Sequence, residues 1–222
     1  MSQTLPPVAN PEIELSISYA APPRRGALRA LWTLDAQLAA TLVRAADPMV
    51  ARLRLTWWRE ALIRLDAAPP PPQPLLATLA AVVLPAGIAG HELAVLTDGW
   101  EALLVPDPLS IDDLEAYASG RGQLFVLGGR VLGAGGFPIA AAGQGWALVD
   151  LAGHVRSAEA AAMARALAGP LVRGAFAQRW PRAVRPFGAM VALAARDLHG
   201  PKEPRGAPRR VWRMLRHRVT GR

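Results

Sequence analysis

Residues 27–65, ALRALWTLDAQLAATLVRAADPMVARLRLTWWREALIRL, decide the fold. Leucines recur there at steps of three and four, which places them on one helical face: Leu28, Leu31, Leu34, Leu38 and Leu42. Asp47 before Pro48 is typical of a helix start, because aspartate caps free N–H groups and proline suits the first turn. A second apolar stripe follows at the same spacing: Leu55, Trp58, Leu62 and Leu65. The stretch therefore predicts two core-forming helices joined near residue 47.

The composition favours the same structural class throughout. Of the 222 residues, 52% are hydrophobic, much of this share is alanine, and only 6% are aromatic. Alanine is the best helix former, and no alternating run bounded by turn signals indicates a strand. We expect one long alanine-rich helix over residues 139–167 and one more short helix between Pro170 and Pro181. The length suits one domain with a sizeable core. We therefore predict an all-α protein, with an irregular lead-in over residues 1–26, a single helical domain of about seven or eight helices over residues 27–200, and a basic tail over residues 201–222.

Cysteine usage and apolar patterning limit the classes of protein. The chain has no cysteine, which excludes disulfides and thiolate metal sites and fits a reducing compartment. Its first residues lack the basic-then-apolar pattern of a secretory signal, so we expect a cytoplasmic protein. Two uncharged stretches, residues 69–90 and 131–149, are interrupted by proline and glycine. Because a membrane span needs about 20 predominantly apolar residues, we interpret both as buried, broken helices.

The positive charge is concentrated at the C-terminus. Of 25 basic and 17 acidic residues, eight basic residues and one acidic residue fall in residues 201–222, so the body is nearly neutral. The run RRVWRMLRHRV is amphipathic and suits the surface of an anionic membrane. The expected membrane-binding residues are Arg209, Arg210, Trp212, Arg213 and Arg216. Nucleic acid is a less favoured polyanion, because no aromatic stacking platform accompanies the basic run. A merely solvated tail is the remaining alternative.

Glycines are unusually frequent in the helix expected after Ser110. They cost about 1 kcal/mol each against alanine in a helix interior: Gly120, Gly122, Gly128 and Gly129. Close packing of another helix or of a ligand would explain them, and fraying of the helix is the simpler alternative.

The pair Trp57-Trp58, followed by Arg59, is the most distinctive local pattern. Adjacent helical residues point about 100° apart, so Trp58 lies on the apolar stripe and Trp57 points toward a neighbouring helix, a groove or a partner. Core packing alone would also explain both rings. The four histidines are scattered without metal-ligand spacing. No P-loop, GxGxxG after a strand or GxSxG occurs, so nucleotide binding and triad hydrolysis have no support.

Three segments together carry a resemblance to a known family. The run from ALRALWTLDAQLA to RLRLTWWREAL, the segment from Ser110 to Tyr117 with its following glycines, and GWALVDLAGHVR at residues 145–156 resemble the squalene/phytoene synthase family. The resemblance implies an all-α isoprenoid-synthase domain with a central cavity. It suggests these ligand-binding residues: Asp35, Arg54, Trp57, Trp58, Arg59 and Tyr117.

The resemblance also implies a loss of catalytic groups. Active members of the family join two prenyl diphosphates with Mg²⁺ held by two aspartate-rich motifs. The first motif would fall at residues 39–43, which read Ala-Ala-Thr-Leu-Val, and the arginine expected before it falls on Ala36. The second would follow Arg156, where the chain reads Ser-Ala-Glu. The chain is therefore more similar to the non-catalytic branch that includes respiratory complex I assembly factors. We expect no catalytic residue, no metal ligand and no cofactor.

Three classes of function remain open. The first is a non-catalytic, membrane-peripheral helper that holds an isoprenoid, another lipid or a partner protein in or near the cavity. The second is an active Mg²⁺-dependent prenyltransferase with an altered metal site. For that, four acids would have to converge in one cavity: Asp35, Asp47, Asp150 and Glu159. The third is an unrelated helical domain with a basic tail.

Overall fold

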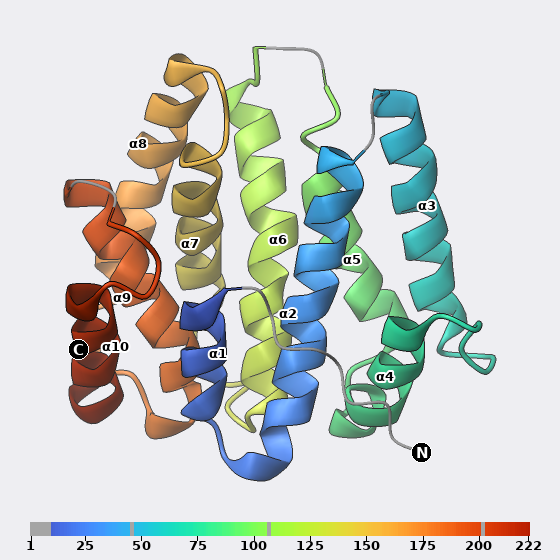
Figure 1. The fold of residues 1–222 in the computed structure, drawn as a ribbon, viewed down its shortest axis with the longest axis horizontal. Coiled ribbons are helices and arrows are strands. Elements are labelled where there is room, and N and C mark those ends of the chain that lie inside the picture. The colour runs from blue at the N-terminus through green and yellow to red at the C-terminus, as the bar shows by residue number, and fades with distance from the viewer. Residues whose placement is uncertain (1–9, 45–46, 106–107, 201–202) are drawn as a thin grey trace.

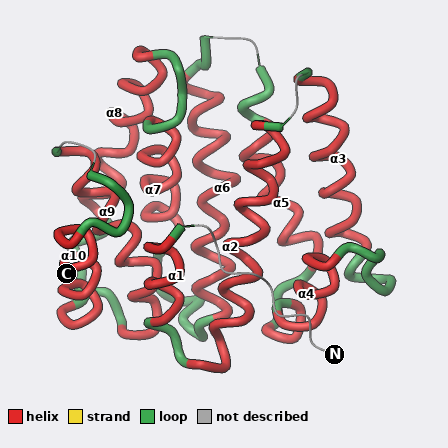
Figure 2. Tube along the Cα trace, in the orientation of Figure 1, coloured by secondary structure: helices red, strands yellow, loops and turns green. Residues whose placement is uncertain are grey.

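The protein is built from helices that stand side by side. The computed structural model describes residues 10–44, 47–105, 108–200 and 203–222. Within these ranges there are ten α-helices, two short 3₁₀ helices and no strand (Figure 2). The elements are α1 (Pro11–Ser18), α2 (Pro22–Val43), α3 (Pro48–Arg64), α4 (Pro74–Val82), η1 (Leu84–Ala86), α5 (Gly90–Glu101), α6 (Ile111–Val131), α7 (Ala140–Ala152), α8 (Ala158–Gly174), η2 (Arg182–Val184), α9 (Arg185–His199) and α10 (Pro208–Thr220).

Helix α6 occupies the centre of the bundle (Figure 1). It packs against α5 on one side, α7 on the other and α2 across its face. Helix α3 packs mainly on α5 at one edge, while α8 and α9 pack on α7 toward the opposite edge. Helix α10 lies on α9, and α1 contacts both α9 and α2. The all-α prediction is confirmed.

The predicted apolar stripes of α2 and α3 face this core. Leu28, Leu31, Leu34 and Leu38 are fully buried, and so is Leu62 on α3. Burying a leucine side chain contributes about 1.5–3 kcal/mol, so these positions contribute strongly to folding. The joint between the two helices is also as predicted: Asp47 caps α3 by accepting a hydrogen bond from the Met49 N–H at 2.7 Å, with Pro48 at the first turn.

The glycines of α6 allow close approach of neighbouring helices. Close packing was one of the two explanations expected for them, and fraying of the helix was the other. A methyl group at Gly120 would overlap the backbone of Gly99 on α5, and one at Gly128 would overlap the ring of Phe187 on α9. Gly122 lies similarly close to Gln144 on α7. Helix packing, and not fraying, therefore accounts for these three residues.

Three expectations about the helices were wrong. Residues 10–26 are not irregular, because Asn10 and Pro11 start α1 and Pro22 starts α2. The long helix expected over residues 139–167 is divided, because α7 ends at Ala152 with Gly153 as its C-cap, and Ser157 caps a new helix, α8. Pro170 lies inside α8 instead of starting a separate helix. The number of helices agrees with the prediction, because the described helices from α2 to α9 number eight where seven or eight were expected over residues 27–200, and α1 and α10 lie outside that range.

Within the described ranges, no single helix is long and apolar enough to cross a membrane. The segments Pro74–Ala86 and Gly90–Glu101 meet the length and composition test only when taken together, and they are bent by 119° where they join.

Candidate ligand cavity

A cavity of about 530 Å³ lies between α1, α2, α6, α7, α8, α9 and the segment that leads into α10. Its volume falls within the range of about 300–1,000 Å³ that is usual for small-molecule sites. The apolar part of its wall includes Trp32, Trp146, Val149, Met190 and Leu193. The polar part is dominated by carboxylates and arginines, which form two separate networks.

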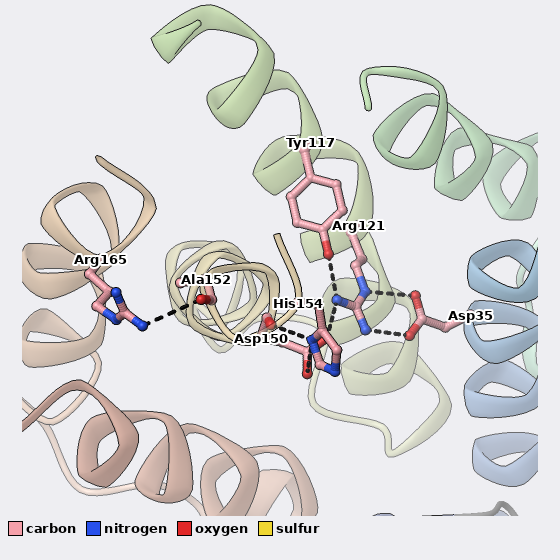
Figure 3. A network of polar contacts seen from close by, with 7 residues as sticks. All are labelled: Asp35, Tyr117, Arg121, Asp150, Ala152, His154 and Arg165. Atoms are coloured by element: carbon pink, nitrogen blue, oxygen red, sulfur yellow. Dashed lines mark hydrogen bonds and ion pairs between the residues drawn. The ribbon is translucent and has the colours of Figure 1, made fainter. Parts of the chain in front are cut away.

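Arg121 is the centre of the first network (Figure 3). It projects from α6, is 5% exposed, and donates two parallel hydrogen bonds of 2.9 Å to the carboxylate of Asp35 on α2. A third hydrogen bond, of 2.6 Å, reaches Asp150 on α7, and a fourth reaches the hydroxyl of Tyr117 one turn earlier on α6. One guanidinium therefore joins three helices around the cavity wall.

Two tryptophan rings lie against the same guanidinium. Its Cζ lies 4.4 Å from the ring centroid of Trp146 and 4.6 Å from that of Trp100, within range for a cation–π interaction. Burial alone would lower the pKa of Arg121, but the charges of Asp35 and Asp150 raise it well above its usual value. Arg121 is thus a permanent, fixed cation.

Tyr117 and Asp150 are each held in one protonation state at neutral pH. Burial raises the pKa of Tyr117, so its hydroxyl stays protonated. Burial also tends to raise the pKa of Asp150, but the charge and hydrogen bond of Arg121 outweigh it and lower the pKa. The network therefore offers a charged, preorganised wall.

A second network closes the opposite side of the cavity. Arg210 on α10 donates to both oxygens of Glu12 on α1, at 2.6 and 3.0 Å, and it also pairs with Asp197 on α9. Glu12 accepts a further hydrogen bond from the Gly206 N–H at 2.9 Å. Burial would raise the pKa of Glu12, but these partners lower it. The expectation that Arg210 binds a membrane was wrong, because its side chain points into the fold.

The rest of the tail is arranged as expected for a surface helix. Helix α10 turns Met214 and His217 inward with Arg210, and leaves Trp212 64% exposed. Leu215 and Val219 share this outer face. Arg209 and Arg216 are exposed beside it and Arg213 is half-buried. Whether these residues bind a membrane remains a prediction.

The expected ligand-binding residues fall into three places. Asp35 lines the cavity, and Tyr117 lies behind it as a partner of Arg121. Arg54, Trp57 and Trp58 instead border a separate shallow hollow of about 230 Å³ between α2 and α3. Arg59 pairs with Asp98 and Glu101 on α5. The structure therefore brings only the first two together at the cavity.

Comparison with known proteins defines the family. The squalene/phytoene synthase family model matches residues 10–125, which is more than half of the chain. The chain belongs to the squalene/phytoene synthase family. No curated protein and no solved structure matches it. The family match includes α1, which the sequence reasoning treated as irregular, and ends within α6.

In the part of the chain that the structure describes, the side chains at the positions where active family members are expected to hold Mg²⁺ do not assemble a metal site. Ala36 and Ala39 line the cavity with methyl groups. The resemblance places an arginine at Ala36 and the start of the first aspartate motif at Ala39. Asp35 and Asp150 do converge, but both bind Arg121. Asp47 caps α3 and Glu159 lies in the first turn of α8. Among the described residues, no group of three or more histidines or acids is arranged to hold a metal ion.

Sequence reasoning missed the arginine at the centre of the site. Arg121 is the middle residue of Gly120-Arg121-Gly122 and lies one helical turn after Tyr117, on the same face. These two signals were present in the segment that carried the family resemblance. The partner, Asp35, is 86 residues away in the sequence, so no local pattern could indicate the pair.

Proposed function

We propose that this member of the squalene/phytoene synthase family is a non-catalytic helper that holds a lipid in its helical cavity at a membrane surface. The observation that carries the proposal is the engagement of Asp35 and Asp150 by Arg121. Three of the four carboxylate oxygens accept its N–H groups at 2.6–2.9 Å. These are the oxygens that a metal ion at this wall would need.

The chemistry of prenyl transfer supports this conclusion. A diphosphate leaving group carries several negative charges and departs when cations neutralise them, and Mg²⁺ is held for this purpose by carboxylate oxygens. Releasing Asp35 and Asp150 for Mg²⁺ would leave the buried charge of Arg121 without its partners. That loss costs several kcal/mol, about 3–5 when a buried pair is broken, and works against metal binding.

The cavity walls favour an apolar guest. Trp32 and Trp146 stand edge to face with centroids 5.2 Å apart, and Val149, Met190 and Leu193 extend the apolar surface. An isoprenoid or acyl chain would be desolvated against these side chains at about 25 cal/mol for each Å² of apolar surface buried.

Two exposed apolar surfaces outside the cavity support the proposed role of a helper. The exposed Trp212, Leu215 and Val219 of α10, beside the charges of Arg209 and Arg216, suit an anionic membrane. On α3, the exposed Met49, Leu53 and Trp57 lie one turn apart along the outer face and suit a protein partner. Neither surface combines a stacking platform with a basic groove of the kind that single-stranded nucleic acid requires.

Two measurements test the cavity proposal. Incubation with Mg²⁺ and radiolabelled farnesyl or geranylgeranyl diphosphate should give no coupled product, and turnover above a buffer blank refutes the non-catalytic assignment. Mass spectrometry of organic extracts from the purified protein should detect a co-purified lipid.

Vesicle flotation tests the membrane proposal. Truncation of residues 201–222 is unsuitable, because it removes Arg210 and breaks the contact with Glu12. Instead, the double variant Trp212→Ser, Leu215→Ser should lose binding to vesicles containing phosphatidylserine. The matched control Val95→Ser, at an exposed site on α5, should bind like the unmodified protein. Equal flotation of all three proteins would contradict the proposal.

A further inference from the structure

The carboxylates that line the cavity all have arginine partners. Asp35 and Asp150 bind Arg121, while Glu12 and Asp197 bind Arg210. The fifth, Glu203, accepts a hydrogen bond of 2.6 Å from Arg196. The acidic charge of the wall is therefore compensated within the protein and does not demand a cation from outside.

Two further arginines line the cavity without an acidic partner. Arg165 on α8 and Arg205, just before α10, form no ion pair with any other described residue. The guanidinium of Arg165 reaches the carbonyl oxygen of Ala152 at 3.4 Å, at the C-terminal end of α7, where Gly153 and His154 also line the cavity (Figure 3).

Arg205 lines the same cavity and acts on two of its carboxylates. For both Glu12 and Asp150, burial raises the pKa and the pairing arginine lowers it, and the charge of Arg205 adds to the lowering. Its guanidinium therefore stands within electrostatic range of α1 and α7 together. Arg165 and Arg205 are both exposed to solvent, whereas Trp32, Met190 and Leu193 are buried inside.

The cavity thus has exposed cationic side chains at its surface and buried apolar side chains inside, which suits an amphiphile with one anionic end. We propose that Arg165 and Arg205 bind the anionic head group of a single-chain lipid, a carboxylate or a phosphate monoester, without a metal ion, while its chain lies against Trp32, Met190 and Leu193. The inference rests on the proposed lipid-holding function and adds the chemical class of the ligand. Guanidinium groups match carboxylate and phosphate oxygens in a forked geometry, and they need no divalent ion to do so.

Ligands that differ only at the head group test this inference. Dodecanoate, dodecyl phosphate and dodecanol are titrated, below their micellar concentrations, into the full-length protein in EDTA. The readout is the intrinsic tryptophan fluorescence, to which Trp32 and Trp146 in the cavity wall contribute. The two anions should bind about tenfold more tightly than the alcohol, a modest gain for charge-assisted hydrogen bonds. Comparison of the two anions identifies whether the natural head group is a carboxylate or a phosphate.

Two variants test whether Arg165 and Arg205 cause the preference for anionic ligands over the alcohol. In Arg165→Gln, Arg205→Gln, the anions should bind only as well as the alcohol, while the affinity for the alcohol stays unchanged. The matched control Arg173→Gln, exposed on the same helix α8 but away from the cavity, should keep the preference. If the alcohol binds the unmodified protein as well as the anions do, or if the double variant keeps the preference, the head-group site is refuted and the lipid-holding function stands. If none of the three ligands binds, both fail.

Discussion

Replacing Arg121 by methionine tests the structural basis of the proposed function. The change removes the cation that Asp35 and Asp150 share and leaves two carboxylates facing each other beside Trp100 and Trp146. Breaking a buried ion pair by removing one partner costs about 3–5 kcal/mol. Asp35 is buried with its side chain only 6% exposed, so the full cost applies there. The side chain of Asp150 is 29% exposed, and solvent screening reduces its share.

The expected loss in the free energy of unfolding is therefore about 3–5 kcal/mol, a large part of the roughly 5–15 kcal/mol that stabilises a typical domain. Urea unfolding followed by tryptophan fluorescence measures it. With a slope of about 2–3 kcal/mol per molar urea, the midpoint should fall by about 1–2.5 M. The triple variant Asp35→Asn, Arg121→Met, Asp150→Asn removes the unpaired charges and should recover more than half of the loss.

Arg130→Met is the matched control for this experiment. Arg130 is also on α6 and pairs with Glu92, but both side chains are about one-third exposed at 34% and 31%. Its removal should cost about 1 kcal/mol or less. A loss of under about 1 kcal/mol for Arg121→Met, or a triple variant no more stable than the single one, would refute the view that Arg121 is fixed by two charges.

Two further variants test the packing of the helices. Burial, with the charge of Arg185, lowers the pKa of His217 from its usual 6.5 to about 4, so the unfolded chain takes up a proton before the folded one. Stability should therefore fall as the pH drops from 6.5 to 4, by up to about 3 kcal/mol, and thermal melts of His217→Phe should lack this component; identical pH profiles would contradict it. Gly120→Ala should lose about 1–3 kcal/mol, because its methyl group overlaps Gly99. Gly26→Ala in α2, which meets no atom within 4 Å, should be neutral or gain up to about 1 kcal/mol, and similar effects at both sites would disprove the close contact.

Local patterns in the sequence predicted the elements whose signals are local. The leucine spacing placed the core face of α2, and Asp47-Pro48 and Ser110 marked real helix starts. Helix α1 carried the same kind of signal, Asn10-Pro11, but the surrounding prolines suggested an irregular segment instead. The break between α7 and α8 was missed because alanine continues on both sides of residues 153–157, and only the cap at Ser157 distinguishes two helices from one.

The site was less predictable, because its contacts join distant segments. The tail pattern correctly indicated an amphipathic helix, but periodicity alone could not show that Arg210 would face inward to meet Glu12. Asp35 and Tyr117 came from the family resemblance and do meet, through Arg121. Trp57 and Trp58, the most conspicuous residues in the sequence, lie at a different hollow.

The ion pair between Glu12 and Arg210 spans 198 positions, nearly the whole polypeptide. Translation proceeds from the first of these residues to the second, so their contact can form only after α10 has been synthesised, which makes it a late step of folding. Before that contact forms, the cavity lacks the part of its wall that Arg210 and Glu12 provide together.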